Sequence, residues 1–318
     1  MSGPQHVPVL LNEVLDLLNV RPGGTYADAT LGLAGHAGAI ARRLGPAGLL
    51  IGFDRDPQAM ALATATLDAL RLELGSQMPQ VRLIAQAFST AADELQPGSL
   101  DGLLADFGVS SLQLDEAHRG FSFRFDAPLD MRMDTRSGAT AGQVVNQADE
   151  EDLANLIYEF GEERRSRRIA RAIVRARPIT TTAELARVIS VAAPSMKSDK
   201  IHPATRTFQA LRIRVNDELG EIRSLLTSAP SLLKVGGRLA VISFHSLEDR
   251  LAKDAIRDGV LHGTWELVTK KPVTATEDEV DRNPRSRSAK LRVAERIQTA
   301  KQVTRKVPPE GGSSRGRR

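Results

Sequence analysis

Two aspartates, Asp54 and Asp106, each stand at the end of a short apolar run, a position from which a carboxylate can reach a ligand. The second begins the triplet Asp-Phe-Gly, which holds magnesium in protein kinases. A kinase also needs a Gly-rich loop, a Val-Ala-Ile-Lys strand and a His-Arg-Asp loop upstream of that triplet, and none of them occurs in this sequence. Asp106 is therefore expected to serve a ligand other than ATP.

A glycine-containing turn, DATLGLAGHAG, precedes both aspartates. Its glycines at 32, 35 and 38 have the spacing G-x-x-G-x-x-G, which differs from the dinucleotide-binding G-x-G-x-x-G and disfavours a nicotinamide or flavin cofactor. Asp54 lies 19 residues beyond Gly35, where a carboxylate can accept both hydroxyl hydrogens of a ribose. Phe88 follows a third apolar run and offers a flat surface for an adenine.

Alternating strand and helix patterns place these residues at one edge of a predicted parallel sheet. Ligands of such sheets bind beyond the carboxyl ends of the strands, so the glycine turn, Asp54, Phe88 and Asp106 are expected to meet there. Together they indicate a site for S-adenosylmethionine. Taken singly, each acid could instead cap a helix, and Phe88 could belong to the core. The strands are predicted at residues 25–30, 48–54, 81–88 and 100–107.

The pattern changes after the fourth strand. From Val109 to about Thr205 the sequence has no good buried strand and favours helices, among them the segment 150–177. Strand patterns resume at 236–244, and the segments 264–273 and 289–297 predict a closing pair. We therefore predict an α/β protein with a class I, Rossmann-like methyltransferase sheet and an inserted helical domain. The expected division is a methyltransferase domain at 1–108 and 206–300, a substrate-recognition insertion at 109–205 and a disordered basic tail at 301–318.

Charge is distributed unevenly along the 318 residues. The formal net charge is +4, yet residues 282–318 alone hold twelve Lys/Arg and two Glu, and residues 164–177 hold seven arginines and no acid. Guanidinium groups match phosphate oxygens, and their binding to nucleic acid releases counterions. Both segments indicate a nucleic-acid partner, although a solvated helix face and a disordered tail would have the same composition.

The sequence contains no cysteine. This excludes disulfides, thiolate zinc sites and every mechanism with a cysteine nucleophile. Methylation at C5 of a pyrimidine needs such a nucleophile, so the expected acceptor is a nitrogen or an oxygen. The sequence has neither an N-terminal signal pattern nor an apolar run of membrane-spanning length, which predicts a soluble, cytoplasmic protein without a membrane partner.

Six segments make the sequence recognisable: HVPVLLNEVLDLL, DATLGLAGHA, GFDRDPQA, DFGVSSLQLDEAHRGFSFRFDAPLDMRMD, SFHSLEDR and NPRSRSAKLRVAER. In this order, from about His6 to Arg296, they resemble the bacterial RsmH (MraW-type) family. The resemblance implies methyl transfer from S-adenosylmethionine to the N4 amine of a cytidine in the decoding (P-site) region of 16S ribosomal RNA, in the small ribosomal subunit. It also implies cofactor contacts at Ala34, Gly35, His36, Asp54, Phe88, Asp106 and Gln113.

The sequence departs from the family at one position of the glycine turn. The family usually has Gly-Gly-His where this chain has Ala34-Gly35-His36. An added methyl group at 34 is tolerated if the backbone there has a negative φ, and it is damaging if φ is positive.

The implied acceptor, a cytosine amine, is a poor nucleophile because its lone pair is delocalised into the ring. Hydrogen-bond acceptors on its two protons would favour the reactive, pyramidal form, and Asp106 is the first candidate acceptor. The aromatic residue that many amino-methyltransferases carry beside this position is absent, and Phe121 and Phe123 are candidates either to replace it or to form core. His245 is the second candidate catalytic residue; it could orient the base, accept a proton or cap the next helix.

RNA contacts are expected from Arg119, Arg132, Arg168, Arg285 and Arg287. No metal is expected to be required, because His245, Glu248 and Asp249 have no further cluster in the sequence to complete a site. The oligomeric state is open, with a homodimer as one candidate. Two other functions stay open as well: methylation of another nitrogen, such as a DNA amine, and RNA binding by a ribosome-assembly factor with a vestigial cofactor site.

Overall fold

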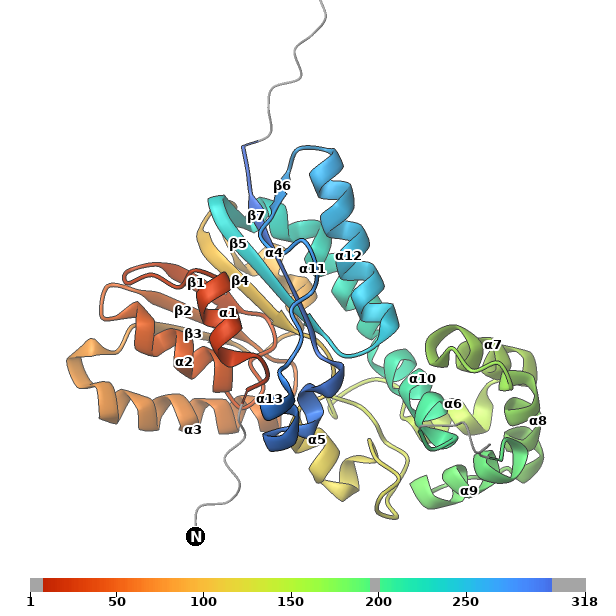
Figure 1. The fold of residues 1–318 in the computed structure, drawn as a ribbon. Coiled ribbons are helices and arrows are strands. Elements are labelled where there is room, and N and C mark those ends of the chain that lie inside the picture. Colours follow the sequence, from red (N-terminus) through yellow and green to blue (C-terminus); the bar gives the residue numbers. More distant parts are fainter. Residues whose placement is uncertain (1–7, 195–200, 299–318) are drawn as a thin grey trace, which may run out of the picture.

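The centre of the molecule is a sheet of seven strands (Figure 1). The structure, a computed structural model, describes residues 8–194 and 201–298. In chain order the strands are β1 (Thr25–Asp28), β2 (Leu49–Phe53), β3 (Gln80–Ile84), β4 (Leu100–Asp106), β5 (Leu233–Ser243), β6 (Trp265–Leu267) and β7 (Lys290–Arg296). Their spatial order is β3-β2-β1-β4-β5-β7-β6. The first five run parallel, and β7 runs antiparallel to β5 and β6.

All the strands predicted from the sequence are present, including the closing antiparallel pair. The third is shorter than predicted because it ends at Ile84, and Phe88 instead begins the short helix η2 (Phe88–Thr90). The edge strand β3 has exposed residues, whereas the inner parallel strands β1, β2 and β4 meet the rule that such strands are covered on both faces and read as short apolar runs. This is why their positions could be taken from the sequence.

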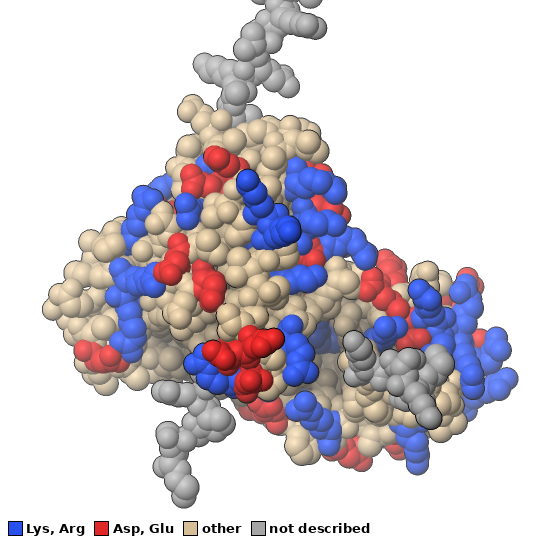
Figure 2. All heavy atoms as spheres, in the orientation of Figure 1, with Lys and Arg blue, Asp and Glu red and all other residues tan. Residues whose placement is uncertain are grey.

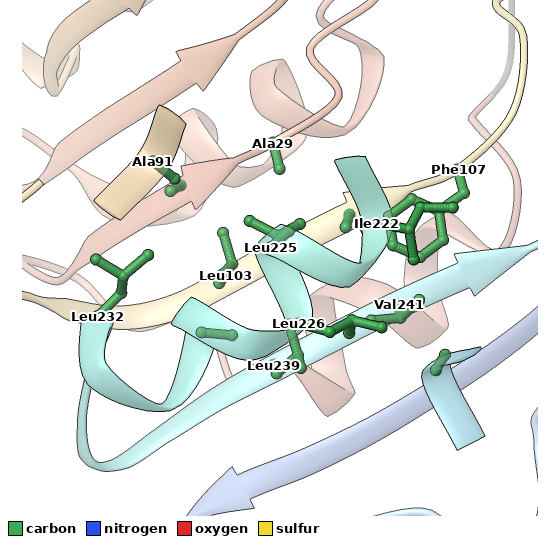
Figure 3. Packing of buried hydrophobic residues seen from close by; sticks show 14 of the residues in the cluster. Ala29, Ala91, Leu103, Phe107, Ile222, Leu225, Leu226, Leu232, Leu239 and Val241 are labelled. Atoms are coloured by element: carbon green, nitrogen blue, oxygen red, sulfur yellow. The ribbon is translucent and has the colours of Figure 1, made fainter. Parts of the chain in front are cut away.

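Helices cover both faces of the sheet (Figure 1). One face carries α1 (Leu11–Leu17), α2 (Gly35–Leu44) and α3 (Pro57–Leu74), and the other carries α4 (Ala91–Glu94), α11 (Glu218–Leu232) and α12 (Ser246–Leu261). Successive residues of β4 alternate between the two cores, so that Leu103 packs with the α11 side and Leu104 with the α2 side. Figure 3 shows Leu225 of α11 beside Leu103. Each buried leucine of this kind contributes about 2 kcal/mol.

The segment between β4 and β5 contains a separate helical core. Its helices are α6 (Ala141–Gln147), α7 (Glu150–Gly161), α8 (Ser166–Ala176), α9 (Thr182–Ala192) and α10 (Ala204–Asn216). They enclose a buried cluster whose members run from Phe121 to Leu211, and Figure 1 shows them to one side of the sheet. Of the described residues between 109 and 205, none lies in a named strand, as predicted.

Two residues with a left-handed backbone each separate a pair of consecutive helices. The pattern over 150–177 is divided between α7 and α8, because Glu162 has a left-handed backbone with φ 48°. Asp217, also with φ 48°, separates α10 from α11 in the same way. The break at Glu162 directly follows Gly161, the last residue of α7, whereas the break at Asp217 has no adjacent glycine or proline to signal it. Because α10 packs on the insertion through Leu211 and on the sheet core through Ile213, it links the two cores.

The remaining elements are short, and several border the carboxyl ends of the strands. They are η1 (Gly75–Gln77), α5 (Ser111–Asp115), η3 (Ala117–Arg119), α13 (Glu277–Arg282) and η4 (Pro284–Ser288). In the part of the chain that the structure describes, no helix has the length and apolar character needed to cross a membrane. The predicted basic tail, residues 301–318, lies outside the described residues.

Candidate functional site

A cavity of about 320 Å³ opens at the carboxyl ends of β1, β2, β4 and β5. Its walls come from the turn after β1, from the strand exits and from the first turn of α12. Eight residues selected from the sequence line it: Gly35, His36, Asp54, Phe88, Asp106, Gln113, His245 and Arg285. The predicted meeting of strand-end residues is therefore observed, although the contact that each makes with a ligand stays a prediction.

The glycine turn is tied to the exit of β2. Gly32 has φ 52° and donates its N–H to Asp54 Oδ2 at 2.9 Å. Ala34 precedes α2 with φ 63°, the left-handed conformation in which a methyl group costs about 1–2 kcal/mol. The methyl group is buried, and hydrogen bonds from Ala34 N–H to the Leu31 carbonyl (2.7 Å) and from Gly38 N–H to the Ala34 carbonyl (2.8 Å) hold the turn. The sequence condition of a negative φ at 34 is thus not met, and the turn carries this strain.

Three carboxyl groups from adjacent strands share this end of the sheet. Burial raises the pKa of Asp54 to about 6 and that of Asp28 also to about 6, and the two charges oppose each other. Burial raises the pKa of Asp106 well above its ordinary value, and the charges of Asp28 and Glu248 add to the effect. The Asp106 N–H donates to Thr30 Oγ1 at 2.7 Å, and Asp106 Oδ2 lies 3.7 Å from His36 Nδ1. Asp106 Oδ1 is buried without a hydrogen-bond partner among the described residues.

The other side of the cavity carries His245 and Glu248. His245 is the N-cap residue of α12, as one of the sequence alternatives proposed, and its ring also lines the cavity. Its Nε2 lies 3.0 Å from Oε1 of Glu248, a residue with no exposed side-chain surface. The other oxygen of Glu248 accepts the N–H groups of Phe244 at 2.8 Å and of His245 at 3.3 Å. Burial opposes ionisation of Glu248, but His245 and the nearby Arg212 outweigh it and hold its pKa below the usual range.

One expectation about metal ligands needs correction. Glu218, which the sequence analysis did not select, brings its carboxylate to His245 and Glu248, and the three ligand atoms lie within 4.8 Å of one another. The statement that no further residue completes such a cluster is therefore wrong. Arg212 donates to both oxygens of Glu218 at 2.8 and 2.9 Å, so a guanidinium already supplies positive charge to the cluster. That no metal is required stays a prediction.

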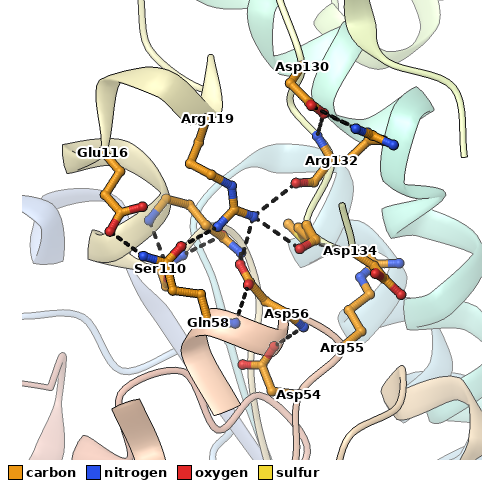
Figure 4. A network of polar contacts seen from close by, with 12 residues as sticks. Asp54, Arg55, Asp56, Gln58, Ser110, Glu116, Arg119, Asp130, Arg132 and Asp134 are labelled. Atoms are coloured by element: carbon orange, nitrogen blue, oxygen red, sulfur yellow. Dashed lines mark hydrogen bonds and ion pairs between the residues drawn. The ribbon is translucent and has the colours of Figure 1, made fainter. Parts of the chain in front are cut away.

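The RNA contact predicted for Arg119 also needs correction. Its side chain is 5 % exposed and donates to Asp56 Oδ2 at 2.8 Å and to the carbonyls of Arg132 and Met133 at 3.0 Å each (Figure 4). Gln113 joins the same network by donating to Asp56 Oδ2 at 3.0 Å. The guanidinium is enclosed by protein, so we assign Arg119 to holding the loop after β4 against the start of α3 rather than to RNA.

The other predicted RNA contacts lie nearer the surface. Arg132 is paired with Asp130 at 2.7 and 2.8 Å, and Arg285 is paired with both oxygens of Asp115 at 2.8 and 3.0 Å. Arg168 and Arg287 are exposed. None of these positions excludes a phosphate contact, and the four remain predictions.

Five exposed arginines of the insertion lie along one side of α8 and just before its start. They are Arg167, Arg168, Arg171 and Arg175 on the helix and Arg164 two residues before it, whereas Ile169, Ala170 and Ile173 on the opposite side of the helix are buried. Residues three and four apart share a helix face, so the arginines form a continuous strip. Figure 2 shows Lys and Arg side chains gathered at the right-hand edge of the molecule, where Figure 1 places α8. We call these five residues the α8 arginine strip.

The aromatic candidates of the sequence analysis belong to the core of the insertion. Phe121 is buried in that cluster, and the ring of Phe123 contacts the ring of Phe208 at a centroid distance of 5.0 Å. Neither lines the cavity. Phe244, which directly precedes His245, does line it and was missed, because an aromatic residue at the end of a buried strand is indistinguishable in sequence from a core residue.

The fold and the cavity define a class of protein. The sheet is Rossmann-like, its strand β7 is antiparallel to β5, and carboxylates line a cavity at the strand exits. These features are characteristic of class I methyltransferases. The MraW methylase family matches residues 3–297, and the chain belongs to this family.

Two relatives of high sequence identity agree with the family assignment. The chain is 71% identical over 296 residues to the ribosomal RNA small subunit methyltransferase H of Acidobacterium capsulatum, covering 93% of this chain and 100% of the relative. It is 59% identical to the protein of the same name from Koribacter versatilis, covering 92% and 94%. Among solved structures, it is similar to a SAM-dependent O-methyltransferase from Thermotoga maritima, with 10% identity, coverage of 94% and 69%, and a TM-score of 0.44.

The predicted cofactor of the methylase family, S-adenosylmethionine, fits the residues of the cavity. A site in which three buried carboxyl groups repel one another favours a ligand that brings positive charge and hydroxyl donors. S-adenosylmethionine has a sulfonium, an ammonium group and a ribose diol. Asp54 is suited to the ribose, Phe88 to the adenine and Asp106 to the methionine end, as the sequence resemblance implied. The unpartnered Oδ1 of Asp106 is an acceptor that such a ligand or its substrate would satisfy.

We expect the affinity for S-adenosylmethionine to fall as the pH drops below about 6. Asp28 and Asp54 have raised pKa values of about 6, and a cationic ligand favours their ionised forms. Protonation at lower pH therefore opposes binding, by roughly tenfold per group for each unit below the pKa. Calorimetric titration between pH 5 and 8 checks this, and Asp54→Asn is expected to flatten the profile. An affinity constant across that range would contradict the assignment of the carboxyl cluster to the cofactor.

Proposed function

We propose that this protein transfers a methyl group from S-adenosylmethionine to the N4 amine of a cytidine in the decoding (P-site) region of 16S ribosomal RNA. The names of the relatives support ribosomal RNA of the small subunit as substrate. The family resemblance of the sequence supports the cytosine amine and the decoding region. The observation that carries the chemistry is Asp106 Oδ1, a buried acceptor without a partner at the exit of the central strand.

The residues of the cavity suit an amine acceptor. When bound, S-adenosylmethionine supplies an electrophilic methyl group on a sulfonium that is already a good leaving group. The chain's task is then to align the amine in a pocket that excludes water and to manage its protons. Asp106 Oδ1 accepts one amine hydrogen, which localises the nitrogen lone pair for attack. As the N–C bond forms and the C–S pair returns to sulfur, the nitrogen releases that proton to Asp106, whose raised pKa favours proton uptake.

The insertion is proposed to recognise the RNA. Its proposed division from the methyltransferase domain at residues 109–205 is supported by the separate core around Leu153 and Ile169, although that core continues to Leu211 in α10. The α8 arginine strip gives the insertion a basic surface. A substrate presented within the assembled subunit would bring phosphates to this strip while the target base enters the cavity. The cytoplasm is the compartment in which such a substrate is found.

The deciding experiment is transfer of labelled methyl from S-adenosylmethionine to small ribosomal subunits that lack the modification, followed by mass spectrometry of the nucleosides. We expect the label in N4-methylcytidine. Label in another nucleoside would indicate a different acceptor. Cofactor binding without any transfer to subunits or naked RNA would favour the ribosome-assembly factor with a vestigial site, and analytical ultracentrifugation of the same protein would decide between monomer and homodimer.

Neutralising the α8 arginine strip is expected to weaken binding to the small subunit. In the variant Arg164→Gln/Arg168→Gln/Arg175→Gln, each lost phosphate contact lowers the slope of log affinity against log salt concentration by about 0.9. Binding is measured by filter retention at several salt concentrations, and transfer at saturating subunit should be preserved.

The matched control is the triple variant Arg42→Gln/Arg71→Gln/Arg257→Gln, which removes three exposed arginines from α2, α3 and α12. It lowers the net charge by the same amount as the α8 strip variant. The slope of log affinity against log salt concentration should stay as in the wild type. Equal losses in the two triple variants would mean that total charge, and not the strip, determines binding.

A further inference from the structure

The cavity contains a second buried acceptor besides Asp106. Glu248 Oε1 has no hydrogen-bond partner among the described residues, and the Glu248 side chain is fully buried. His245 Nε2 lies 3.0 Å away as an ion-pair partner, and like Glu248 Oε1 it has no hydrogen bond among the described residues. Leaving a buried polar atom unsatisfied costs about 1–3 kcal/mol, and more for a charged group. An atom of this kind in a cavity wall indicates a ligand group that satisfies it.

The two oxygens that lack a hydrogen bond belong to neighbouring elements. Asp106 ends β4, and Glu248 lies in the first turn of α12, which directly follows β5, the strand paired with β4. Gly108 borders the route between them: a Cβ atom at this residue would lie 4.0 Å from Glu248 Oε1 and 3.4 Å from the Phe244 ring. Gly108 and Glu248 both line the cavity, and the absence of a side chain at 108 keeps that part of its wall free of further atoms. The charge of Glu248 also contributes to the raised pKa of Asp106, so the two groups act on the same space.

The direction and charge of Glu248 are fixed by its surroundings. Its Oε2 is held by the N–H groups of Phe244 and His245, which leaves Oε1 facing away from the backbone. Arg212, anchored on Glu218, contributes positive charge that favours the carboxylate form. An acceptor that is ionised, buried and held in one orientation is preorganised for a hydrogen-bond donor.

We propose that Glu248 is the second hydrogen-bond acceptor for the amine that is methylated, so that each of its two hydrogens meets one carboxylate, on Asp106 and on Glu248. This inference rests on the proposed function. A cytosine presents two hydrogens on N4 and suits an acidic acceptor, whereas a uracil presents the O4 acceptor, which two carboxylates repel. The pair thus selects an exocyclic amine and holds its lone pair toward the methyl group.

The test is Glu248→Gln, compared with Glu184→Gln. Glutamine at 248 keeps an oxygen for the N–H groups of Phe244 and His245 but turns an amide donor toward the amine. We expect kcat for transfer to small subunits to fall about 100-fold while the affinity for S-adenosylmethionine changes by less than about twofold. Glu184 holds the same capping position in α9, away from the cavity, that Glu248 holds in α12. Glu184→Gln should retain the wild-type rate. A Glu248→Gln enzyme that transfers at the wild-type rate would overturn the proposal.

A second measurement uses the wild-type protein and does not depend on how the variant folds. Small subunits with uridine in place of the target cytidine are added as competitors, and we expect them to compete about tenfold less well than unmodified cytidine subunits. Equal competition would overturn the role of the two carboxylates in selecting the amine. Failure of the wild-type protein to methylate cytidine subunits would instead remove the proposed function, and the inference with it. If the wild-type protein methylates cytidine subunits and Glu248→Gln is fully active, the proposed function stands and only the role of Glu248 is excluded.

Discussion

Replacing Asp106 by alanine is expected to lower kcat for methyl transfer by about a thousandfold. The change removes the buried Oδ1 that has no partner in the protein and with it the group whose raised pKa suits it to take the amine proton. Transfer to small subunits at saturating S-adenosylmethionine, measured in single turnovers, isolates this step from cofactor binding. The affinity for the cofactor should fall much less, because Asp54 and Phe88 remain.

Two further variants separate the roles of Asp106. Asparagine at 106 keeps an acceptor oxygen but cannot take up a proton, so its rate should lie between those of alanine and wild type. Asp101→Asn changes the same residue type on the same strand at the opposite end, where Asp101 accepts the Thr25 N–H at 2.8 Å, and its rate should stay close to wild type. An alanine variant within tenfold of the wild-type rate would exclude Asp106 from the chemistry.

The strand exits were predictable because their physics is local. Short apolar runs that end in an acid or an aromatic residue define buried parallel strands, and parallel strands bring their carboxyl ends to one edge. That reasoning found Asp54, Phe88 and Asp106. Asp28 could have been found in the same way, since it ends the first strand, but a side chain within a strand pattern does not reveal that its carboxyl group is buried near Asp54 and Asp106.

The opposite wall could not be predicted, because it is assembled by tertiary packing. Arg212 and Glu218 flank the break between α10 and α11, and they reach Glu248 only because α11 and α12 pack on the same face of the sheet. Nothing in the spacing of these residues along the chain indicates a shared site. The break at Asp217 is itself a left-handed aspartate without a glycine signal.

Arginine counts were the least reliable sequence signal. The sequence does not show which of the seven arginines in residues 164–177 face the solvent. In the structure, Arg177 donates to the carbonyl of Val145 at 2.8 Å and also to that of Ala148. Only the residues on the outer face of α8 form the strip. The same ambiguity explains Arg119: its two terminal guanidinium nitrogens donate to a carboxylate, to carbonyls and to Gln58 in the interior, yet its sequence context is that of a surface loop.

The free energy of unfolding is expected to fall by about 3 kcal/mol in Arg119→Met, as breaking a buried ion pair leaves Asp56 uncompensated. The Arg119 and Asp56 side chains are 5 % and 2 % exposed, so water cannot replace the lost guanidinium. Urea denaturation measures the change. A decrease below about 1 kcal/mol, the usual value of an exposed pair, would contradict the structural role.

Asp56 has a second role besides its pairing with Arg119. It caps α3 by accepting the Gln58 N–H at 3.0 Å, so Asp56→Asn removes the charge while keeping an oxygen for the cap. The double variant Asp56→Asn/Arg119→Met should therefore recover part of the stability lost in Arg119→Met, since no unpaired charge stays buried. Arg136→Met removes an arginine that pairs with Asp134 at 59 % exposure and should cost little. If the double variant were less stable than Arg119→Met, the packing of the arginine side chain, and not its charge, would hold the loop after β4 in place.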